Sequence, residues 1–248
     1  MTSTSETGHA KNVANFDQLI ATVISFGTQY KPSRTELQIP ALQALAASAR
    51  ASLNKVDTAL PAYKNAVAAR EVKFSPLSKL TTRLLNTVKS TTTTVAVDDN
   101  VKSLVYKIQG AKATPKLTEE EKTALAAEGK STKEISASQM SYDSRLENLN
   151  KLLLQLGSIP EYRPNEPELQ VATLRQLYND MNTLNTTVVT AQTALDNARI
   201  ARNEVLYKEI NGLVDIAADA KTYVKAVFGA SAPQFRQVSK IKFNVVKP

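Results

Sequence analysis

The 248-residue chain carries 31 Lys and Arg side chains against 23 Asp and Glu, which gives a formal net charge of +8. It has no cysteine, which excludes a disulfide framework, a thiolate metal site and a cysteine nucleophile. Residues 1–11 are polar and lack the apolar segment of a signal peptide, and no apolar run approaches the roughly 18 residues that span a membrane. These features favour a helical protein without a transmembrane span, and we expect a cytoplasmic location.

Taken in order, the chain begins with a Ser- and Thr-rich stretch, residues 1–11, that we expect to be a disordered tail. Apolar side chains at helical spacing then predict a short helix over residues 12–26. A similar pattern of leucines before Gly157 predicts its counterpart in the second half of the chain.

The segment after each short helix occurs twice. Tyr30-Lys31-Pro32 returns as Tyr162-Arg163-Pro164, and residues 28–73 match residues 160–205 at 15 of 46 positions without a gap. We interpret this as an internal duplication. The expected organisation is a helical repeat over 12–110, a polar linker over 111–140 and a second helical repeat over 141–248.

Both copies of the matched segment open with a tyrosine two residues before a proline: Tyr30 and Pro32, then Tyr162 and Pro164. Proline fixes φ and moves the preceding residue out of the α region, so the chain is expected to turn here. The tyrosine ring can pack into the corner while its hydroxyl stays in water. A structural turn is the favoured interpretation, and a binding role is the alternative.

A long helix is predicted after each turn, because apolar or small residues recur at alternating steps of three and four. This apolar seam is expected to pack lengthwise against another helix, and Arg70 and Arg202 occupy it as register-setting residues. Ser75-Pro76 predicts a break in the first copy. No proline interrupts residues 168–228, so one continuous helix is predicted there. The seam consists of Leu42, Leu45, Ala49, Ser52, Val56, Ala59, Tyr63 and Ala66, and of Leu174, Leu177, Met181, Leu184, Val188, Ala191, Leu195 and Ala198.

A short β-strand is predicted at the end of each repeat, over residues 104–108 and 240–245, because the second of these alternates apolar and polar side chains. Such strands would pair with each other or add to the edge of a neighbour, and a final helical turn is the alternative. Within the linker, Thr118 followed by Glu121 predicts one short capped helix.

The residues offer little for catalysis. His9 is the only histidine, which excludes Ser-His-Asp triads and histidine metal clusters. Glu119, Glu120 and Glu121 are the densest carboxylate run, and they fit an exposed helix start. We therefore predict a protein that is not an enzyme, with no catalytic residues, no metal site and no cofactor.

The charge is concentrated at the end of the chain, where no acidic residue follows Asp219. One hypothesis makes these residues a phosphate-binding or partner-binding surface. The other is that the lysines keep a half-buried edge strand soluble. The candidate residues are Lys221, Lys225, Arg236, Lys240 and Lys242.

Together these patterns predict an all-α fold, an elongated antiparallel helical bundle built from two tandem repeats. The leading hypothesis is a non-catalytic structural, scaffold or assembly protein that binds a protein partner or itself through long helical surfaces. The alternative is a binding module for nucleic acid or an anionic surface. A third hypothesis is a membrane-active helical bundle.

Overall fold

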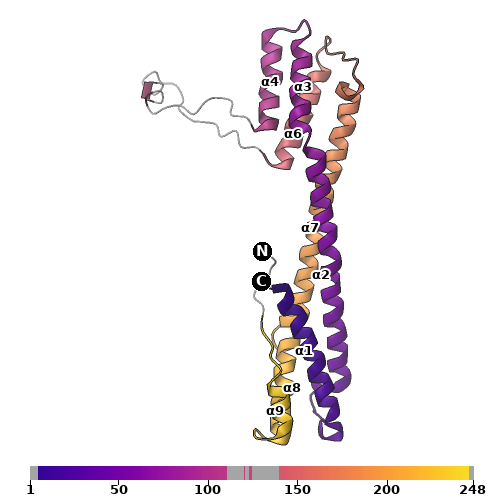
Figure 1. The fold of residues 1–248 in the computed structure, drawn as a ribbon, viewed down its shortest axis with the longest axis vertical. Coiled ribbons are helices and arrows are strands. Elements are labelled where there is room, and N and C mark those ends of the chain that lie inside the picture. The colour runs from indigo at the N-terminus through magenta and orange to yellow at the C-terminus, as the bar shows by residue number, and fades with distance from the viewer. Residues whose placement is uncertain (1–4, 111–119, 121–122, 125–139, 246–248) are drawn as a thin grey trace. The chain divides into compact units, whose positions relative to one another are not determined.

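The structure is a computed structural model that describes residues 5–110, 120, 123–124 and 140–245 (Figure 1). Every regular element in these residues is helical, so the all-α prediction is confirmed. None of the described helices combines the length and the apolar character that crossing a membrane requires. The α-helices are α1 (Ser5–Ser25), α2 (Ile39–Phe74), α3 (Leu77–Lys89), α4 (Val95–Gln109), α6 (Tyr142–Gly157), α7 (Val171–Tyr207), α8 (Leu213–Phe228) and α9 (Pro233–Ser239).

The chain divides into two compact units that cut across the predicted repeats. Unit 1 joins Met1–Lys64 to Ala191–Pro248, and unit 2 is Asn65–Thr190. The core of unit 1 is formed by α1, the start of α2, the end of α7, α8 and α9. The core of unit 2 is formed by the end of α2, α3, α4, α6 and the start of α7. Each core therefore combines segments from both halves of the chain.

In unit 1, α1 packs against α8 and α9 (Figure 1). It begins at Ser5, so the prediction of a disordered tail is wrong for residues 5–11. The physical reason is tertiary: His9 is only 3% exposed, because it lies against the ring of Tyr207 at the end of α7. Burial against a distant segment thus orders residues whose composition is that of a tail.

The seam positions predicted for α2 and α7 are all buried or half-buried, as the alternating spacing requires. Helix α2 continues through Pro61 and ends at Phe74. Pro76 then precedes the first residue of α3, so the break predicted at Ser75-Pro76 is confirmed. Pro76, and not Ser75, occupies the N-cap position of α3, and no side chain caps this end of the helix.

The single helix predicted over residues 168–228 is wrong. Helix α7 ends at Tyr207, and a turn leads into α8 at Leu213. In this turn Ile210 has a φ of 70°, and its backbone N–H donates to the carboxylate of Asp215 at 2.8 Å. A Cβ atom at position 212 would lie only 2.5 Å from the Lys208 carbonyl oxygen, so this close turn requires glycine. The break therefore comes from a capping carboxylate and a glycine, without a proline.

The predicted strands are also wrong, and no strand occurs in the described parts of the chain. Residues 104–108 lie within α4, where Val105 and Ile108 face the core of unit 2. Residues 242–245 have no regular structure, but Ile241 and Phe243 do point into the core of unit 1. The predicted alternation of buried and exposed side chains is present, but the backbone of this segment is hydrogen-bonded to side chains of helix α1 and not to another strand. The predicted linker over residues 111–140 and the helix capped at Thr118 lie almost entirely outside the described residues.

Candidate functional site

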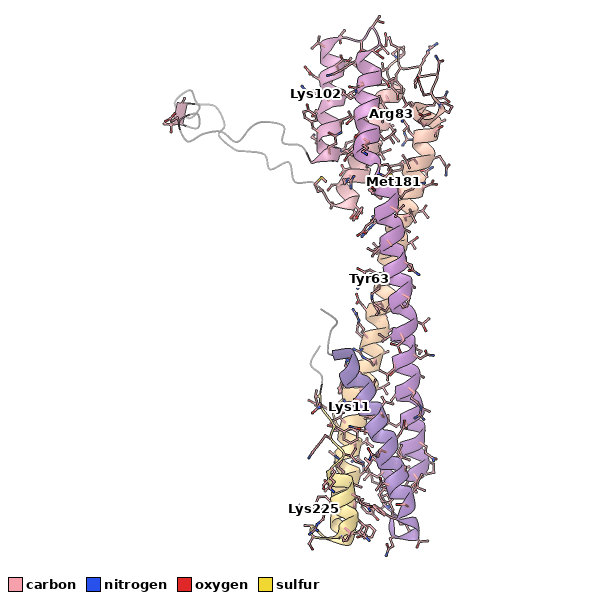
Figure 2. All side chains as sticks on the ribbon, viewed as in Figure 1. Lys11, Tyr63, Arg83, Lys102, Met181 and Lys225 are labelled. Atoms are coloured by element: carbon pink, nitrogen blue, oxygen red, sulfur yellow. The ribbon has the colours of Figure 1, made fainter. Side chains whose placement is uncertain are left out.

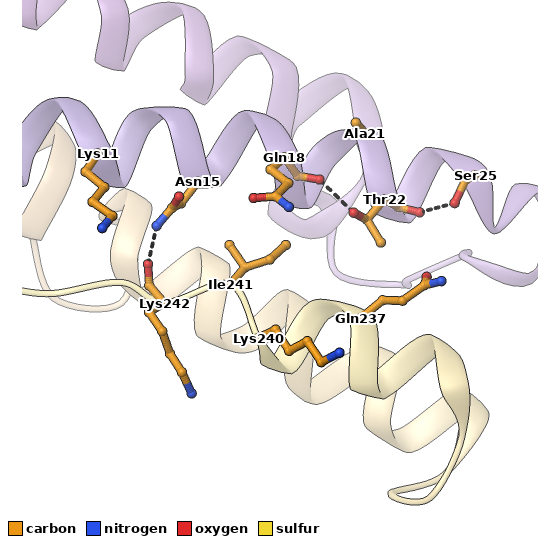
Figure 3. Close-up of a pocket in the computed structure, with 10 residues that line it drawn as sticks. All are labelled: Lys11, Asn15, Gln18, Ala21, Thr22, Ser25, Gln237, Lys240, Ile241 and Lys242. Carbon is orange, nitrogen blue, oxygen red and sulfur yellow. Dashed lines mark hydrogen bonds between the residues drawn. The ribbon is translucent and has the colours of Figure 1, made fainter.

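A groove in unit 1 runs between α1 and the C-terminal segment, residues 240–245 (Figure 3). Its volume is about 720 Å³, and none of the described residues that line it is Asp or Glu. Lys11 comes from α1, while Lys240 and Lys242 come from the C-terminal segment. The lining consists of Lys11, Asn15, Gln18, Ala21, Thr22, Ser25, Gln237, Lys240, Ile241 and Lys242. We call this cavity the basic groove.

The side chains of the basic groove do not converge on one point. Figure 3 shows Lys11 pointing from α1 toward the C-terminal segment, whereas the Lys242 side chain points away from α1. All three lysines are exposed. Such spread positive charge without carboxylates suits an extended anion better than a single small ion.

The structure separates the five basic residues predicted from the sequence. Lys240 and Lys242 line the basic groove, whereas Lys221, Lys225 and Arg236 do not. The Lys225 ammonium lies 5.8 Å from the ring centre of Phe235, and Arg236 is exposed on α9. Lys11 and Lys225, labelled in Figure 2, both belong to unit 1.

Lys221 has a structural role. Its ammonium donates to the carbonyl of Ile241 and lies 4.7 Å from the ring centre of Phe243. Burial lowers the pKa of Lys221, and the positive charge of Lys242 lowers it further. The Lys221 side chain therefore holds the C-terminal segment by a hydrogen bond and a ring contact. Its charged form is disfavoured there, because the ammonium is partly buried and lies near the positive charge of Lys242.

Two asparagines of α1 hold the backbone of the same segment. The Nδ2 of Asn12 donates to the carbonyl of Asn244 at 2.6 Å, and the Asn244 N–H donates back to Oδ1 of Asn12 at 3.1 Å. The Nδ2 of Asn15 donates to the carbonyl of Lys242 at 2.6 Å (Figure 3). The amide of Asn12 thus bonds the chain as a neighbouring β-strand would.

Sequence reasoning missed Lys11, Asn12 and Asn15, because about 230 residues separate them from their partners. One signal was available. Continuing the apolar spacing of α1 upstream from Phe16 reaches Asn12 and then His9, so two polar residues occupy a buried stripe. Polar groups in such positions require hydrogen-bond partners. Asn12 is 2% exposed and finds them in Asn244 and in the hydroxyl of Tyr207.

The two predicted turns have the same internal hydrogen bonds. The Tyr30 hydroxyl donates to the Leu37 carbonyl at 2.9 Å, and the Tyr162 hydroxyl donates to the Leu169 carbonyl at 2.7 Å. Pro32 and Pro164 each accept from a glutamine side chain at 3.5 Å. The hydroxyls are therefore buried and bonded, which corrects the expectation that they stay in water.

The pKa of both tyrosines is raised to about 12, and burial is the largest cause. The neighbouring ring of Tyr223 adds to this effect for Tyr30, and the charge of Glu166 adds to it for Tyr162. These values stabilise the protonated hydroxyl that the turn uses as a donor. The geometry is that of a structural turn.

The two seam arginines have different surroundings. Arg70, in unit 2, lies 3.8 Å from the ring centre of Tyr142 and donates to the Asn185 side chain at 2.9 Å. Arg202, in unit 1, is 6% exposed and donates to the side chain of Asn203. Asn185 in turn donates to Asp143, so Arg70 belongs to a polar chain that joins α2, α7 and α6. A register role therefore fits Arg70 best.

Unit 2 has a second groove, between α2 and α7, with a volume of about 590 Å³. It is apolar except at one edge, where the Lys73 ammonium and the Asp180 carboxylate pair at 2.9 Å. This ion pair lowers the pKa of Asp180. The lining consists of Ala68, Ala69, Val72, Lys73, Pro76, Leu177 and Leu184. We call it the apolar groove.

Among the described residues, no group of three or more His, Asp or Glu side chains is placed to hold a metal ion. Comparison with protein-family models, with curated proteins and with solved structures finds no match to this chain. The functional conclusion therefore rests on the two grooves and on the hydrogen bonds that hold the C-terminal segment.

Proposed function

We propose that the protein is a non-catalytic scaffold or assembly protein that binds a partner protein through the surfaces of its long helices. The observation that carries this proposal is the apolar groove of unit 2. Val72, in its wall, is 74% exposed, an unusual position for a large apolar side chain beside other apolar groups. The groove offers apolar walls, and its charged lining residue, Lys73, is paired with Asp180.

The lining of the apolar groove suits a helix of the partner. Ala68 and Ala69 are small, so a partner backbone can approach α2 closely. Leu177 and Leu184 provide apolar contacts about two helical turns apart on α7. The Lys73–Asp180 pair supplies a polar rim. This is the arrangement by which an amphipathic helix binds in a groove.

A charge placed in the groove tests the proposal. In Val72→Lys the new ammonium should disfavour an apolar partner helix, and Val95→Lys is the matched control. Val95 is 76% exposed in the same unit, at the start of α4 and outside the groove. Molar mass by light scattering across a concentration series reports self-assembly, and chemical cross-linking of the source extract followed by mass spectrometry reports a different partner.

Loss of assembly or of cross-linked partners in Val72→Lys, with both retained in Val95→Lys, supports the proposal. A wild-type protein that stays at 27.0 kDa at all concentrations and cross-links to nothing would remove it. Equal effects of the two substitutions would show that the apolar groove is not the binding surface.

The duplication forms part of the proposal. The matching bonds of Tyr30 and Tyr162, seven residues ahead in each case, support two copies of one ancestral unit arranged as tandem repeats. An elongated antiparallel bundle remains a prediction that small-angle scattering of the full chain can test.

The basic groove supports a second candidate, a binding site for an extended anion such as nucleic acid or polyphosphate. Unit 1 holds fifteen Lys and Arg against nine Asp and Glu, so +6 of the net +8 belongs to it. Binding of a fluorescent single-stranded oligonucleotide should weaken linearly on a log–log plot against salt. Lys11→Gln should reduce both affinity and slope, whereas Lys102→Gln in unit 2 should change neither. A flat salt dependence would reject this candidate.

A further inference from the structure

The end of the described chain is held as proteins hold an extended peptide ligand. Asn12, Asn15 and Lys221 bond backbone groups of residues 241–244, and Asn12 bonds both the carbonyl and the N–H of Asn244. Hydrogen bonds to the backbone provide affinity for a peptide whatever its side chains are. We call Asn12, Asn15, Lys221 and the adjoining core surface the seat.

Two side chains of the segment provide the specificity. Ile241 is 5% exposed in the core of unit 1. Phe243 packs edge-on against Phe16 of α1, with ring centres 6.5 Å apart at 78°. Because the two anchors alternate along an extended chain, both enter the seat from the same side of the segment. The next residue on that side, Val245, is 62% exposed, so the contact ends there.

None of these contacts depends on the covalent connection between seat and segment. That connection passes through Gly229, between α8 and α9, at a φ of 93°. No atom lies within 4 Å of the place where its Cβ would be. Space is therefore open beside Gly229. The seven-residue α9 would move with the segment, and its Val238 is buried in the core of unit 1.

The charges oppose the docked segment. It brings Lys240 and Lys242 into a region that already contains Lys11 and Lys221, and no Asp or Glu occurs among the described residues lining the groove. The positive charge of Lys242 repels the Lys221 ammonium and lowers its pKa. Like charges at short range disfavour binding, and salt screens them. The seat therefore holds its own segment less firmly than its hydrogen bonds alone would suggest.

We propose that the seat also accepts residues 240–244 of a second copy of this chain, so that two copies exchange their C-terminal segments. Every contact made within one chain is available between two, and a reciprocal exchange closes as a twofold dimer. The occupant is a second copy, because this chain itself carries the segment that matches the backbone bonds and both anchors. The inference goes beyond the scaffold proposal and does not use the apolar groove.

Mixing two full-length variants tests the exchange. Phe243→Ala keeps the seat but weakens the segment, whereas the double variant Asn12→Ala, Asn15→Ala keeps the segment but weakens the seat. Each alone should stay near 27.0 kDa, since neither pairs a good seat with a good segment. Their mixture should form a 1:1 complex of twice that mass in light scattering, and higher salt should strengthen it.

The matched control replaces the second component with the triple variant Asn12→Ala, Asn15→Ala, Phe243→Ala, which has neither part, and no complex should form. A mixture of the two folded variants that remains at 27.0 kDa up to millimolar concentration would overturn the proposal. A complex that forms equally with the triple variant would also overturn it, because the segment would then not be the contact.

A second measurement decides the matter if the asparagine variant loses its helical circular dichroism. A labelled synthetic peptide of residues 240–248 is titrated into full-length Phe243→Ala. Saturable binding that is at least tenfold tighter than for the same peptide with Phe243→Ala supports the exchange. Absence of binding, or equal binding of the two peptides, overturns it. Val72→Lys should leave this binding unchanged, which separates the exchange from the apolar groove.

Discussion

Tyr30 and Tyr162 show how one side chain fixes a turn. Each hydroxyl satisfies a buried carbonyl seven residues ahead. Replacement by Phe leaves that carbonyl without its donor, so Tyr30→Phe and Tyr162→Phe should each lower the free energy of unfolding by about 1–2 kcal/mol. Tyr63→Phe, at a half-buried tyrosine of α2, is the control and should change it by less than about 0.5 kcal/mol. Urea denaturation measures all three, and equal effects would contradict the prediction.

The same tyrosines make stability depend on alkaline pH. Their pKa in the folded protein is raised to about 12 from an ordinary value of 10.0. A raised pKa means that the folded state binds more protons than the unfolded state between these values. The stabilisation is fully present below pH 10 and is lost as pH rises toward 12, at about 1.4 kcal/mol per pKa unit.

The pH prediction is therefore differential. From pH 9 to pH 11.5, the wild-type protein should lose stability more steeply than the double variant Tyr30→Phe, Tyr162→Phe, because lysine titration affects both proteins alike. Urea midpoints at several pH values measure the two slopes. Parallel slopes would show that these hydroxyls do not carry the pH dependence.

Ile210 is the one described non-glycine residue with a positive φ, and it is branched at Cβ. Its side chain is 68% exposed, so little burial is lost on removing it. Ile210→Gly should raise the free energy of unfolding by up to about 1 kcal/mol, because relief of the left-handed strain exceeds the entropy cost of glycine. Ile200→Gly, at a 61% exposed position within α7, should lower it by about 1 kcal/mol. Thermal unfolding that shows destabilisation in both would refute the strain argument.

At the scale of elements, the break between α7 and α8 depends on Gly212. A Cβ there would meet the Lys208 carbonyl oxygen at 2.5 Å and the Lys208 nitrogen at 2.6 Å, and backbone atoms cannot easily shift. Gly212→Ala should therefore cost about 1–3 kcal/mol. Gly157→Ala, at the end of α6, meets only a Val171 methyl at 4.0 Å and should gain about 0.4–1 kcal/mol. Chemical denaturation of both variants compares them, and similar costs would contradict this explanation of the break.

The C-terminal segment shows which part of an element the sequence could predict. Alternation correctly placed Ile241 and Phe243 on the buried side. It could not identify the hydrogen-bonding partner, because periodicity describes one face of a chain and says nothing of what lies beside its edge. Asn12 of α1 takes the place of a strand. Residues 104–108 do not alternate apolar and polar side chains in the same way. They belong to α4, whose buried residues Val101, Val105 and Ile108 follow helical spacing.

At the scale of the whole molecule, spacing within helices was predictable and partnership between helices was not. The seams of α2 and α7 follow from steps of three and four, which are local. Lys11 and Lys240 line the same groove only because unit 1 contains both ends of the chain. The duplication left open whether the two repeats form one core, whereas each of the two compact units combines segments from both halves of the chain. Only three-dimensional contacts could reveal that.

The assignment of helices to two compact units predicts which helices unfold together. Val23 of α1 belongs to the core of unit 1, and Val105 of α4 belongs to the core of unit 2. Each Val→Ala change should weaken its own core by on the order of 1–2 kcal/mol. Since local opening follows cooperative units, amide exchange should accelerate roughly tenfold in the affected unit.

Hydrogen exchange read by mass spectrometry should then give opposite patterns. Val23→Ala should accelerate exchange in α8 and α9, about 200 residues away, and leave α6 unchanged, although α6 is the predicted repeat counterpart of α1. Val105→Ala should accelerate exchange in α3 and α6 and leave α8 unchanged. Acceleration confined to residues 12–110 in both variants would mean that the repeats, and not the compact units, are the cooperative elements. Such a result would contradict the division of the chain into two compact units, each with its own core.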